Sequence, residues 1–129
     1  RDHDPRGAPP ALPKTPDLAA SFASYLEKKK VKSGRLLVIG SNKESCASAA
    51  HFARAGFDVH LVGESDPYIA NLDLYGVHLY TQSLNEHWLF DDAYFDLALN
   101  FITLTAKLQL MRVLKDGAYY YSDGKIRKN

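Results

Sequence analysis

The chain has 129 residues, a length that suits a single domain, and 46% of its residues are apolar, enough for a hydrophobic core. Its 16 Lys and Arg residues nearly balance its 15 Asp and Glu residues, so it lacks the basic surplus typical of a nucleic-acid-binding domain. The single cysteine, Cys46, excludes an intrachain disulfide and fits an intracellular, reducing compartment. The sequence predicts neither a membrane span nor a signal peptide.

Residues 1–14 are rich in proline and charge, which favours an extended arm without regular structure. We expect this arm to lie on a partner protein, because ordering it in isolation would cost about 1 kcal/mol per residue in backbone entropy. Residues 15–129 form the expected domain. Its first helix is predicted to begin with Thr15 as the capping residue and Pro16 at the first helical position, and to end near Lys30.

Residues 35–40 read RLLVIG, a continuous apolar run typical of a central parallel strand that is buried on both faces. The pattern then alternates between helix and strand. Further strands are expected at residues 58–63, 77–80, 95–101 and 118–122. Helices are expected at residues 44–55, 67–74 and 104–114, the last of them facing the core through Leu104, Leu108 and Met111. We expect a turn at residues 115–117 and a solvated basic tail at residues 125–129.

Strands that alternate with helices predict right-handed crossovers and a parallel sheet. The expected fold is therefore α/β, a Rossmann-like three-layer sandwich with a parallel five-stranded sheet of order 3-2-1-4-5. In such a sheet a ligand binds at the carboxyl ends of the strands, where the strand order reverses. The residues predicted to lie there are Gly40, Ser41, Asn42, Asn100 and Thr103.

The segment from Leu37 to Glu64 resembles the first strand–helix–strand unit of NAD(P)-binding Rossmann domains, most of all that of the hydroxyacyl-CoA dehydrogenases. The matching stretches are VIG at 38–40, AHFARAG at 50–56 and DVHLV at 58–62. The resemblance implies an NAD(P) site at the turn after the first strand, with Glu64 near the ribose. Of the three glycines in that family's fingerprint only Gly40 is kept. Asn42 and Ser45 replace the others, and Glu44 adds negative charge where phosphate would sit.

The second half of the chain is similar instead to class I methyltransferases. The similar stretches are FDDAYFDLALN at residues 90–100 and RVLKDG at residues 112–117. This resemblance implies S-adenosylmethionine as the cofactor, although the glycine loop of that family is absent as well. The two resemblances agree on a doubly wound sheet and differ in the ligand.

No catalytic residue and no metal site are expected from the sequence. Cys46 lies on a stripe of small residues and is interpreted as a core residue. His60 and His78 lie on neighbouring strands and could approach one another, but half-buried sheet histidines are the simpler interpretation. The aromatic segments at residues 88–90 and 119–121 should point partly outward, which favours a protein interface.

The leading interpretation is a non-catalytic accessory subunit of a larger protein assembly, with no cofactor. Its partners would bind the arm and the exposed aromatic residues, and nucleic acid is not an expected partner. The start at Arg1 would fit removal of a transit peptide and a place in the mitochondrial matrix. The alternative is an NAD(P)-dependent oxidoreductase or S-adenosylmethionine-dependent methyltransferase domain with a divergent loop. Gly40, Ser41, Asn42, Glu64, Asn100 and Thr103 would then hold the nucleotide.

Overall fold

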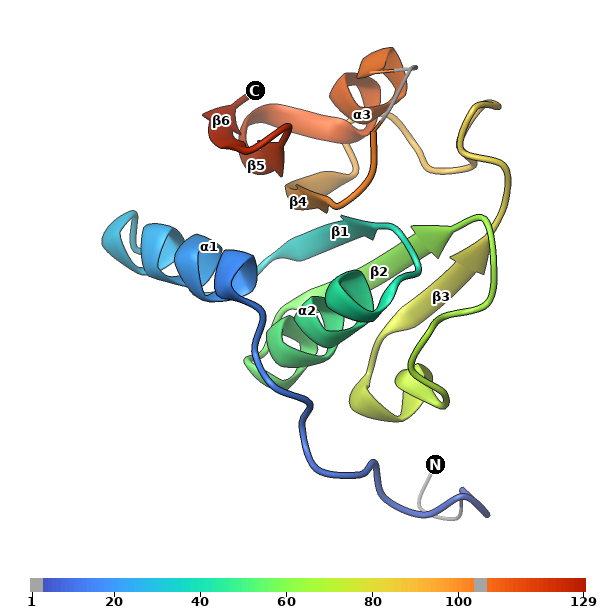
Figure 1. The fold of residues 1–129 in the computed structure, drawn as a ribbon. Helices are drawn as coiled ribbons and strands as arrows, with labels where there is room; N and C mark the ends of the chain where they lie inside the picture. Colours follow the sequence, from blue (N-terminus) through green and yellow to red (C-terminus); the bar gives the residue numbers. More distant parts are fainter. Residues whose placement is uncertain (1–3, 104–106) are drawn as a thin grey trace.

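The computed structural model describes residues 4–103 and 107–129, which form a six-stranded sheet of order β3-β2-β1-β4-β5-β6 (Figure 1). Strands β1 to β5 pair in parallel, and β6 is antiparallel to β5. The strands are β1 (Arg35–Ile39), β2 (Asp58–Gly63), β3 (His78–Thr81), β4 (Phe95–Asn100), β5 (Leu114–Ser122) and β6 (Lys125–Lys128). The α/β Rossmann-like fold and the order of the first five strands are thus confirmed.

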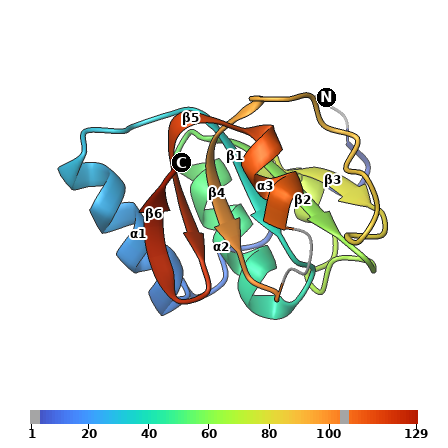
Figure 2. The same cartoon turned by 90° about the horizontal axis from the view of Figure 1, so that it is seen from above.

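Strand β1 lies between β2 and β4, and each of its faces meets a separate hydrophobic cluster. Leu36 and Val38 face the side covered by helices α1 (Asp17–Lys28) and α2 (Lys43–Arg54). Leu37 and Ile39 face the side covered by helix α3 (Lys107–Val113) and the loop of residues 82–94 (Figures 1 and 2). Successive strand residues point to opposite faces, so burial on both sides explains why the run is apolar without alternation.

The C-terminal residues form strand β6 and not the expected solvated tail. Asp123 and Gly124 connect β5 to β6 with φ angles of +53° and +81°, the backbone of a two-residue hairpin turn. Residues 115–117, expected as a turn, lie inside β5 instead. There Gly117 has φ +84° and donates its N–H to the carbonyl of Asn129, so a bulge takes the place of the turn.

Three helix predictions need correction. Pro16, expected at the first helical position, is the capping residue of helix α1 and offers no side-chain acceptor, and the Thr15 hydroxyl lies 2.8 Å from Nε2 of His51 instead. The helix expected at residues 67–74 is a single 3₁₀ turn, η1 (Leu72–Tyr75). Helix α3 buries Leu110 and leaves Leu108 82% exposed. Because the helix is only seven residues long, its packing against β4 and β5 decides which of its residues are buried. Leu104, predicted on the same face, lies outside the described residues.

The proline-rich arm lies against its own domain (Figure 1). Arg6 bridges Asp4 and Asp73, each at 2.7 Å, and Leu12 packs against the core on the α2 side. Tyr75 donates its hydroxyl to backbone carbonyls of the arm at 3.2 and 3.3 Å. Contacts within the chain therefore offset part of the entropy cost of ordering this segment, and a partner bound to the arm remains a prediction.

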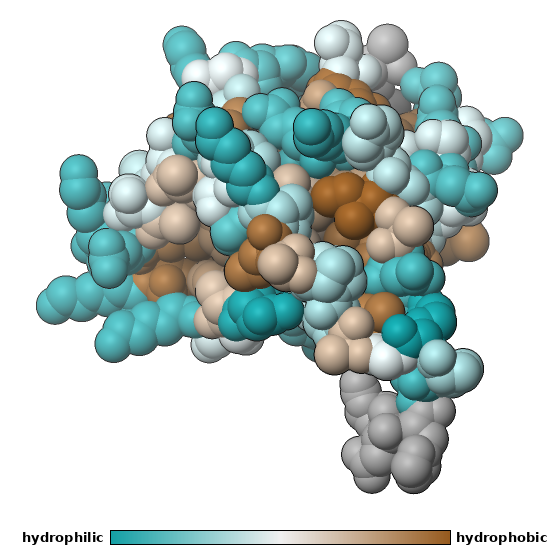
Figure 3. Space-filling view, turned by 60° about the horizontal axis from the view of Figure 1, so that its bottom comes forward, coloured by the Kyte–Doolittle hydropathy of each residue, from teal (hydrophilic) through white to brown (hydrophobic). Residues whose placement is uncertain are grey.

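The aromatic segments expected to be exposed are mostly buried. Trp88 is fully buried, and its indole N–H donates to the carbonyl of Leu84 at 3.0 Å. Tyr68 and Tyr80 are the aromatic residues with the most exposed surface in the described chain. On the face formed by the arm, α1 and α2, apolar side chains occur as small separate patches among polar ones (Figure 3). None of the described helices has the length and apolar character needed to cross a bilayer.

Candidate functional site

The loops that follow β1, β2 and β4 meet at one edge of the sheet, which we call the carboxyl edge (residues 40–45, 63–65 and 100–103). Parallel strands bring their carboxyl ends together here, and the order of connections reverses at β1. The structure therefore brings the six predicted site residues to the same edge. Their roles in it differ.

Gly40 makes the tight turn that leaves β1, as predicted. Its φ is +130°, a backbone region that L-residues with a side chain rarely adopt. Its N–H donates to the carbonyl of Val62 at 2.8 Å. A Cβ atom here would lie 3.3 Å from Oγ of Ser45 and 3.4 Å from the Ile102 side chain, so glycine is required for close approach as well.

Asn42 and Ser45, which stand where the fingerprint has glycines, cap helix α2. The side-chain oxygen of Asn42 accepts the N–H of Ser45 at 2.8 Å, and the Ser45 hydroxyl donates to the carbonyl of Asn42 at 3.0 Å. One of the free N–H groups at the helix start is thereby used within the loop. With the exposed carboxylate of Glu44 beside them, this helix end is a poor site for pyrophosphate.

Ser41 ties the loop after β1 to the loop after β2. Its hydroxyl lies 2.9 Å from that of Ser65, and its carbonyl accepts the N–H of Tyr68 at 2.9 Å. A Cβ atom at Gly63 would come within 2.7 Å of Cβ of Ser41. Gly63 occupies the place where dehydrogenases carry an acidic residue for the ribose, and the close approach of Ser41 explains why no side chain fits there.

Glu64 is exposed and links β2 to the loop of residues 82–94. Its Oε2 accepts the N–H of Leu84 at 2.8 Å, the one hydrogen bond that its side chain makes to the described residues. Oε1 can still accept a ligand hydroxyl. Glu64 therefore positions a loop, a role that the sequence did not indicate, and its predicted contact with a ribose stays a prediction.

Asn100 and Thr103 line an open cleft of about 230 Å³, together with Leu18, Glu44, Phe101, Ile102, Tyr121, Asp123 and Gly124. Asn100 is buried, and both ends of its amide are used: Nδ2 donates to Ser122 and Oδ1 accepts the N–H of Ile102. Lys107, 2.6 Å from Asp123, lowers the pKa of that carboxyl through a hydrogen bond. The cleft thus presents acidic and neutral polar groups.

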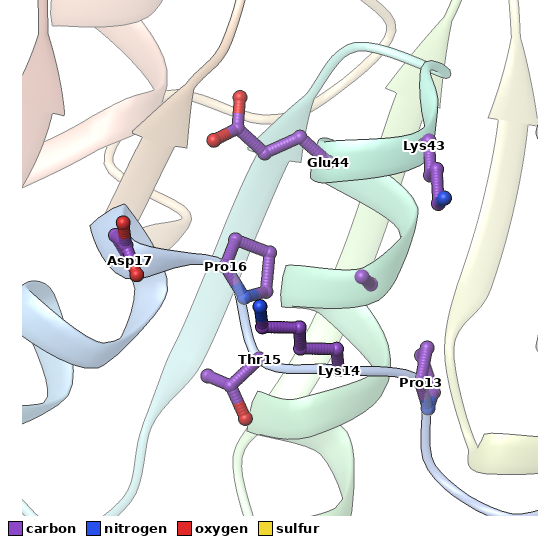
Figure 4. Close-up of a pocket in the computed structure, with 8 residues that line it drawn as sticks. Pro13, Lys14, Thr15, Pro16, Asp17, Lys43 and Glu44 are labelled. Carbon is purple, nitrogen blue, oxygen red and sulfur yellow. The ribbon is translucent and has the colours of Figure 1, made fainter.

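Glu44 also borders a second open cleft, of about 390 Å³, between the arm and the start of α2 (Figure 4). The backbone from Pro13 to Asp17 forms one wall of this cleft, and Lys43, Glu44 and Ala47 form the other. Glu44 thus lies between the two clefts, on the carboxyl edge. The sequence identified this carboxylate only as an obstacle to phosphate, because its position in the clefts depends on how the arm and α1 pack.

Two further polar side chains, those of Cys46 and Asp92, have structural roles. Cys46 is buried and its thiol points to the carbonyl of Ser41 at 3.6 Å, as expected for a core residue. Asp92, in the loop of residues 82–94, pairs with Arg112 at 2.7 Å. Arg112 also donates to the carbonyls of Trp88 and Phe90, so this pair fixes the loop of residues 82–94 against α3.

Among solved structures, the chain is similar to several methyltransferases. One is the 1,6-didemethyltoxoflavin-N1-methyltransferase of Burkholderia thailandensis, solved with S-adenosylhomocysteine (TM-score 0.63, 18% identity, 81% of this chain and 50% of that one). Another is a protein assigned as a sarcosine dimethylglycine methyltransferase of Galdieria sulphuraria (TM-score 0.64, 16% identity, 80% of this chain and 44% of that one). A third is assigned as an S-adenosylmethionine-dependent methyltransferase of Methanococcus maripaludis (TM-score 0.59, 14% identity, 80% of this chain and 53% of that one). No protein-family model and no curated protein sequence matches the chain.

The chain has a methyltransferase-like Rossmann fold. The specific resemblance to hydroxyacyl-CoA dehydrogenases is not supported, since the similar solved structures are methyltransferases. That resemblance came from one strand–helix–strand unit, which doubly wound folds share for reasons of packing. The chain spans about half the length of the methyltransferases that it matches.

Proposed function

We propose that this chain is an S-adenosylmethionine-binding domain of a methyltransferase. The observation that carries the proposal is the carboxyl edge, where a Gly40 turn, the Glu64 carboxylate and a cleft beside Glu44 lie together in a methyltransferase-like sheet. Substrate recognition and the identity of the methyl acceptor would depend on parts that the comparison proteins have outside the shared half.

Charge distinguishes the two cofactors that the sequence left open. NAD(P) carries a pyrophosphate, which a carboxylate in the first turn of α2 repels. S-adenosylmethionine has no phosphate, and its sulfonium and ammonium groups outweigh its one carboxylate, so its net charge is positive. Glu44, exposed at the start of α2 and bordering both clefts, therefore counts against a dinucleotide and in favour of a cationic ligand. The second fingerprint glycine lets pyrophosphate approach the backbone, so its absence weakens the case for NAD(P) more than the case for S-adenosylmethionine, which has no pyrophosphate.

The chain's own residues can be given roles in such a site. Gly40 would provide the tight turn between β1 and the ligand site, and Oε1 of Glu64 would accept ribose hydroxyls. Glu44 would attract the cationic end of the ligand. The cofactor itself supplies an activated methyl group, so the protein's contribution is mainly to position donor and acceptor, which needs no Ser-His-acid arrangement.

Calorimetric titration with S-adenosylhomocysteine, S-adenosylmethionine and NAD⁺ tests the proposal. We expect binding of the first two at micromolar concentrations and none of NAD⁺. Glu44→Gln should weaken S-adenosylmethionine by about fivefold, the loss of roughly 1 kcal/mol for one unit charge at about 4 Å in water. Glu64→Gln should weaken both adenosyl ligands while still accepting the N–H of Leu84, and Glu86→Gln, an exposed loop change, serves as the control.

The same titration decides between the proposal and the accessory-subunit interpretation. If the folded chain binds none of the three ligands at millimolar concentration, the Ser41–Gly63 and Ile102–Gly40 contacts have closed the edge, and a non-catalytic subunit is the better description. Size-exclusion chromatography of a cell extract then tests the predicted partners, and fractionation tests the predicted mitochondrial location.

A further inference from the structure

Two histidines and an aspartate form a compact group in the amino halves of β2 and β3, away from the carboxyl edge. His60 of β2 pairs in register with His78 of β3, and Asp58 lies two residues before His60. Residues two apart in a strand share a face, so all three side chains lie on the α3 side of the sheet, where β2 and β3 run side by side (Figure 1). We call Asp58, His60 and His78 the histidine cluster.

The ligand atoms of the histidine cluster have the spacing of a metal site. Nε2 of His60 lies 3.2 Å from Oδ1 of Asp58, and Nε2 of His78 lies 3.3 Å from the same oxygen. All three atoms lie within 4.8 Å of one another. Bonds of about 2.0–2.1 Å to a tetrahedral zinc ion place neighbouring ligand atoms roughly 3.3 Å apart, so an ion fits with little movement.

One nitrogen of the cluster lacks a partner that its burial demands. Nε2 of His60 is buried and has no hydrogen-bond partner among the described residues, although Oδ1 of Asp58 lies 3.2 Å away. A buried polar atom without a hydrogen bond costs roughly 1–3 kcal/mol, so its retention needs a reason. A metal ion between the three side chains would satisfy this nitrogen.

The surroundings orient these ligands. The other ring nitrogen of His60, Nδ1, lies 2.9 Å from the hydroxyl of Tyr80, which fixes the ring. Arg35 lies 3.5 Å from Oδ2 of Asp58, which leaves Oδ1 toward the histidines. Such partners behind the ligands are usual in metal sites. His78 and Asp58 are about half exposed, so an ion can enter and water can occupy a fourth position.

We propose that Asp58, His60 and His78 bind a divalent transition-metal ion, with zinc the best match to two imidazoles, one carboxylate and an open position. The protonation states agree with this. Burial, together with His78 and Arg35, lowers the pKa of His60, against the opposing effect of Asp58. The pKa of Asp58 is lowered by the histidines and Arg35, although burial alone would raise it. Neutral imidazole and ionised carboxylate are the forms that ligate metal.

The site is independent of the proposed cofactor function, since it shares no residue with the carboxyl edge. Arg35 brings positive charge near the ion, so we expect micromolar and not nanomolar affinity. Cu²⁺ should bind more tightly than Zn²⁺, and Mg²⁺ should not compete, because imidazole ligands do not suit it.

The test uses the full chain without a polyhistidine tag, stripped with chelator and titrated with Zn²⁺ and with Co²⁺ by calorimetry and visible absorption. We expect one ion per chain and the intense visible bands of low-coordinate cobalt. Replacing a residue that only hydrogen-bonds to a metal ligand can already weaken binding by about 100-fold. His78→Ala and Asp58→Asn remove ligands themselves, so each should weaken binding by about 100-fold or more. His87→Ala, which removes an exposed loop histidine, should leave binding unchanged.

Absence of Zn²⁺ binding at 100 times the protein concentration would overturn the proposal, as would unchanged affinity in His78→Ala. An equal loss in His87→Ala would also overturn it, because binding would then be adventitious. Circular dichroism of each variant shows whether it is folded, and His78 is exposed enough for its replacement to preserve the fold. S-adenosylhomocysteine titration of the same variants separates this proposal from the cofactor proposal, since His78→Ala should not affect that ligand.

Discussion

The two ends of the parallel sheet differ in whether their polar side chains have hydrogen-bond partners. At the carboxyl edge, the side chains of Ser41, Asn42, Ser45 and Asn100 all make hydrogen bonds within the chain. Gly63 has no side chain because Ser41 fills the space that one would need. At the other end, the histidine cluster brings three ligand groups together and leaves Nε2 of His60 without a hydrogen bond. Satisfied groups stabilise the fold and leave a ligand at the carboxyl edge only the remaining acceptors, such as Oε1 of Glu64, whereas an unsatisfied buried atom costs stability and therefore points to a ligand. Polar residues at a strand end therefore indicate a ligand site only where some of their hydrogen-bonding atoms are not already used within the protein.

The largest expected effect lies in the loop of residues 82–94, which supports the carboxyl edge through Leu84. Trp88→Ala should lower the free energy of unfolding by about 3–5 kcal/mol, because the side chain is fully buried and its N–H bonds the carbonyl of Leu84. Urea unfolding measures this. Leu89→Ala, 84% exposed, should change stability by less than about 0.5 kcal/mol. Equal effects would mean that the loop does not pack as described.

Gly63→Ala tests how tightly the carboxyl edge is closed. The new methyl group would lie 2.7 Å from Cβ of Ser41, so we expect a loss of about 1–3 kcal/mol from overpacking. The double variant Gly63→Ala with Ser41→Gly should recover part of this loss, which identifies the contact responsible. A neutral Gly63→Ala variant would show that the edge has room, and would favour a bound cofactor there.

Asp96, at the start of β4, should give a smaller, pH-dependent effect. Its carboxylate accepts the N–H of Arg35 at 2.8 Å and pairs with Lys115 at 2.9 Å. Although burial raises its pKa, these contacts lower it below the usual value. A lowered folded-state pKa gives stability that is present above the unfolded pKa of about 3.9 and is lost as the pH falls further.

Asp96→Asn should therefore cost about 1–2 kcal/mol at pH 7, the size of one hydrogen bond to a charged group, and little below pH 3. Urea unfolding between pH 2.5 and pH 7 checks this, and Asp91→Asn in the exposed loop is the control. If both variants showed the same pH dependence, the acid sensitivity would come from overall charge and not from Asp96.

Hydrophobic pattern alone was enough to predict the centre of this protein. The RLLVIG run predicted a central strand because burial on two faces removes alternation. The turn at Gly40 was implied by the glycine fingerprint of the Rossmann resemblance and not by hydrophobic pattern. The hairpin of β5 and β6 was missed, although Asp123-Gly124 is a strong sequence signal for a two-residue turn. The charges of Lys125, Arg127 and Lys128 obscured it, yet an edge strand is where such charges belong.

Tertiary structure alone decided which polar residues are free to bind a ligand. The sequence placed His60 and His78 on neighbouring strands, but the register between β2 and β3 decided that the two residues pair. The fold then brought Nε2 of each histidine close to the same oxygen, Oδ1 of Asp58. It placed Glu64 near a ribose site, while the path of a distant loop gave its carboxylate the N–H of Leu84. Local pattern fixes which face a side chain takes, because that depends on backbone period. Which atoms meet across that face depends on contacts between segments that are far apart in the chain. No local sequence pattern encodes those contacts.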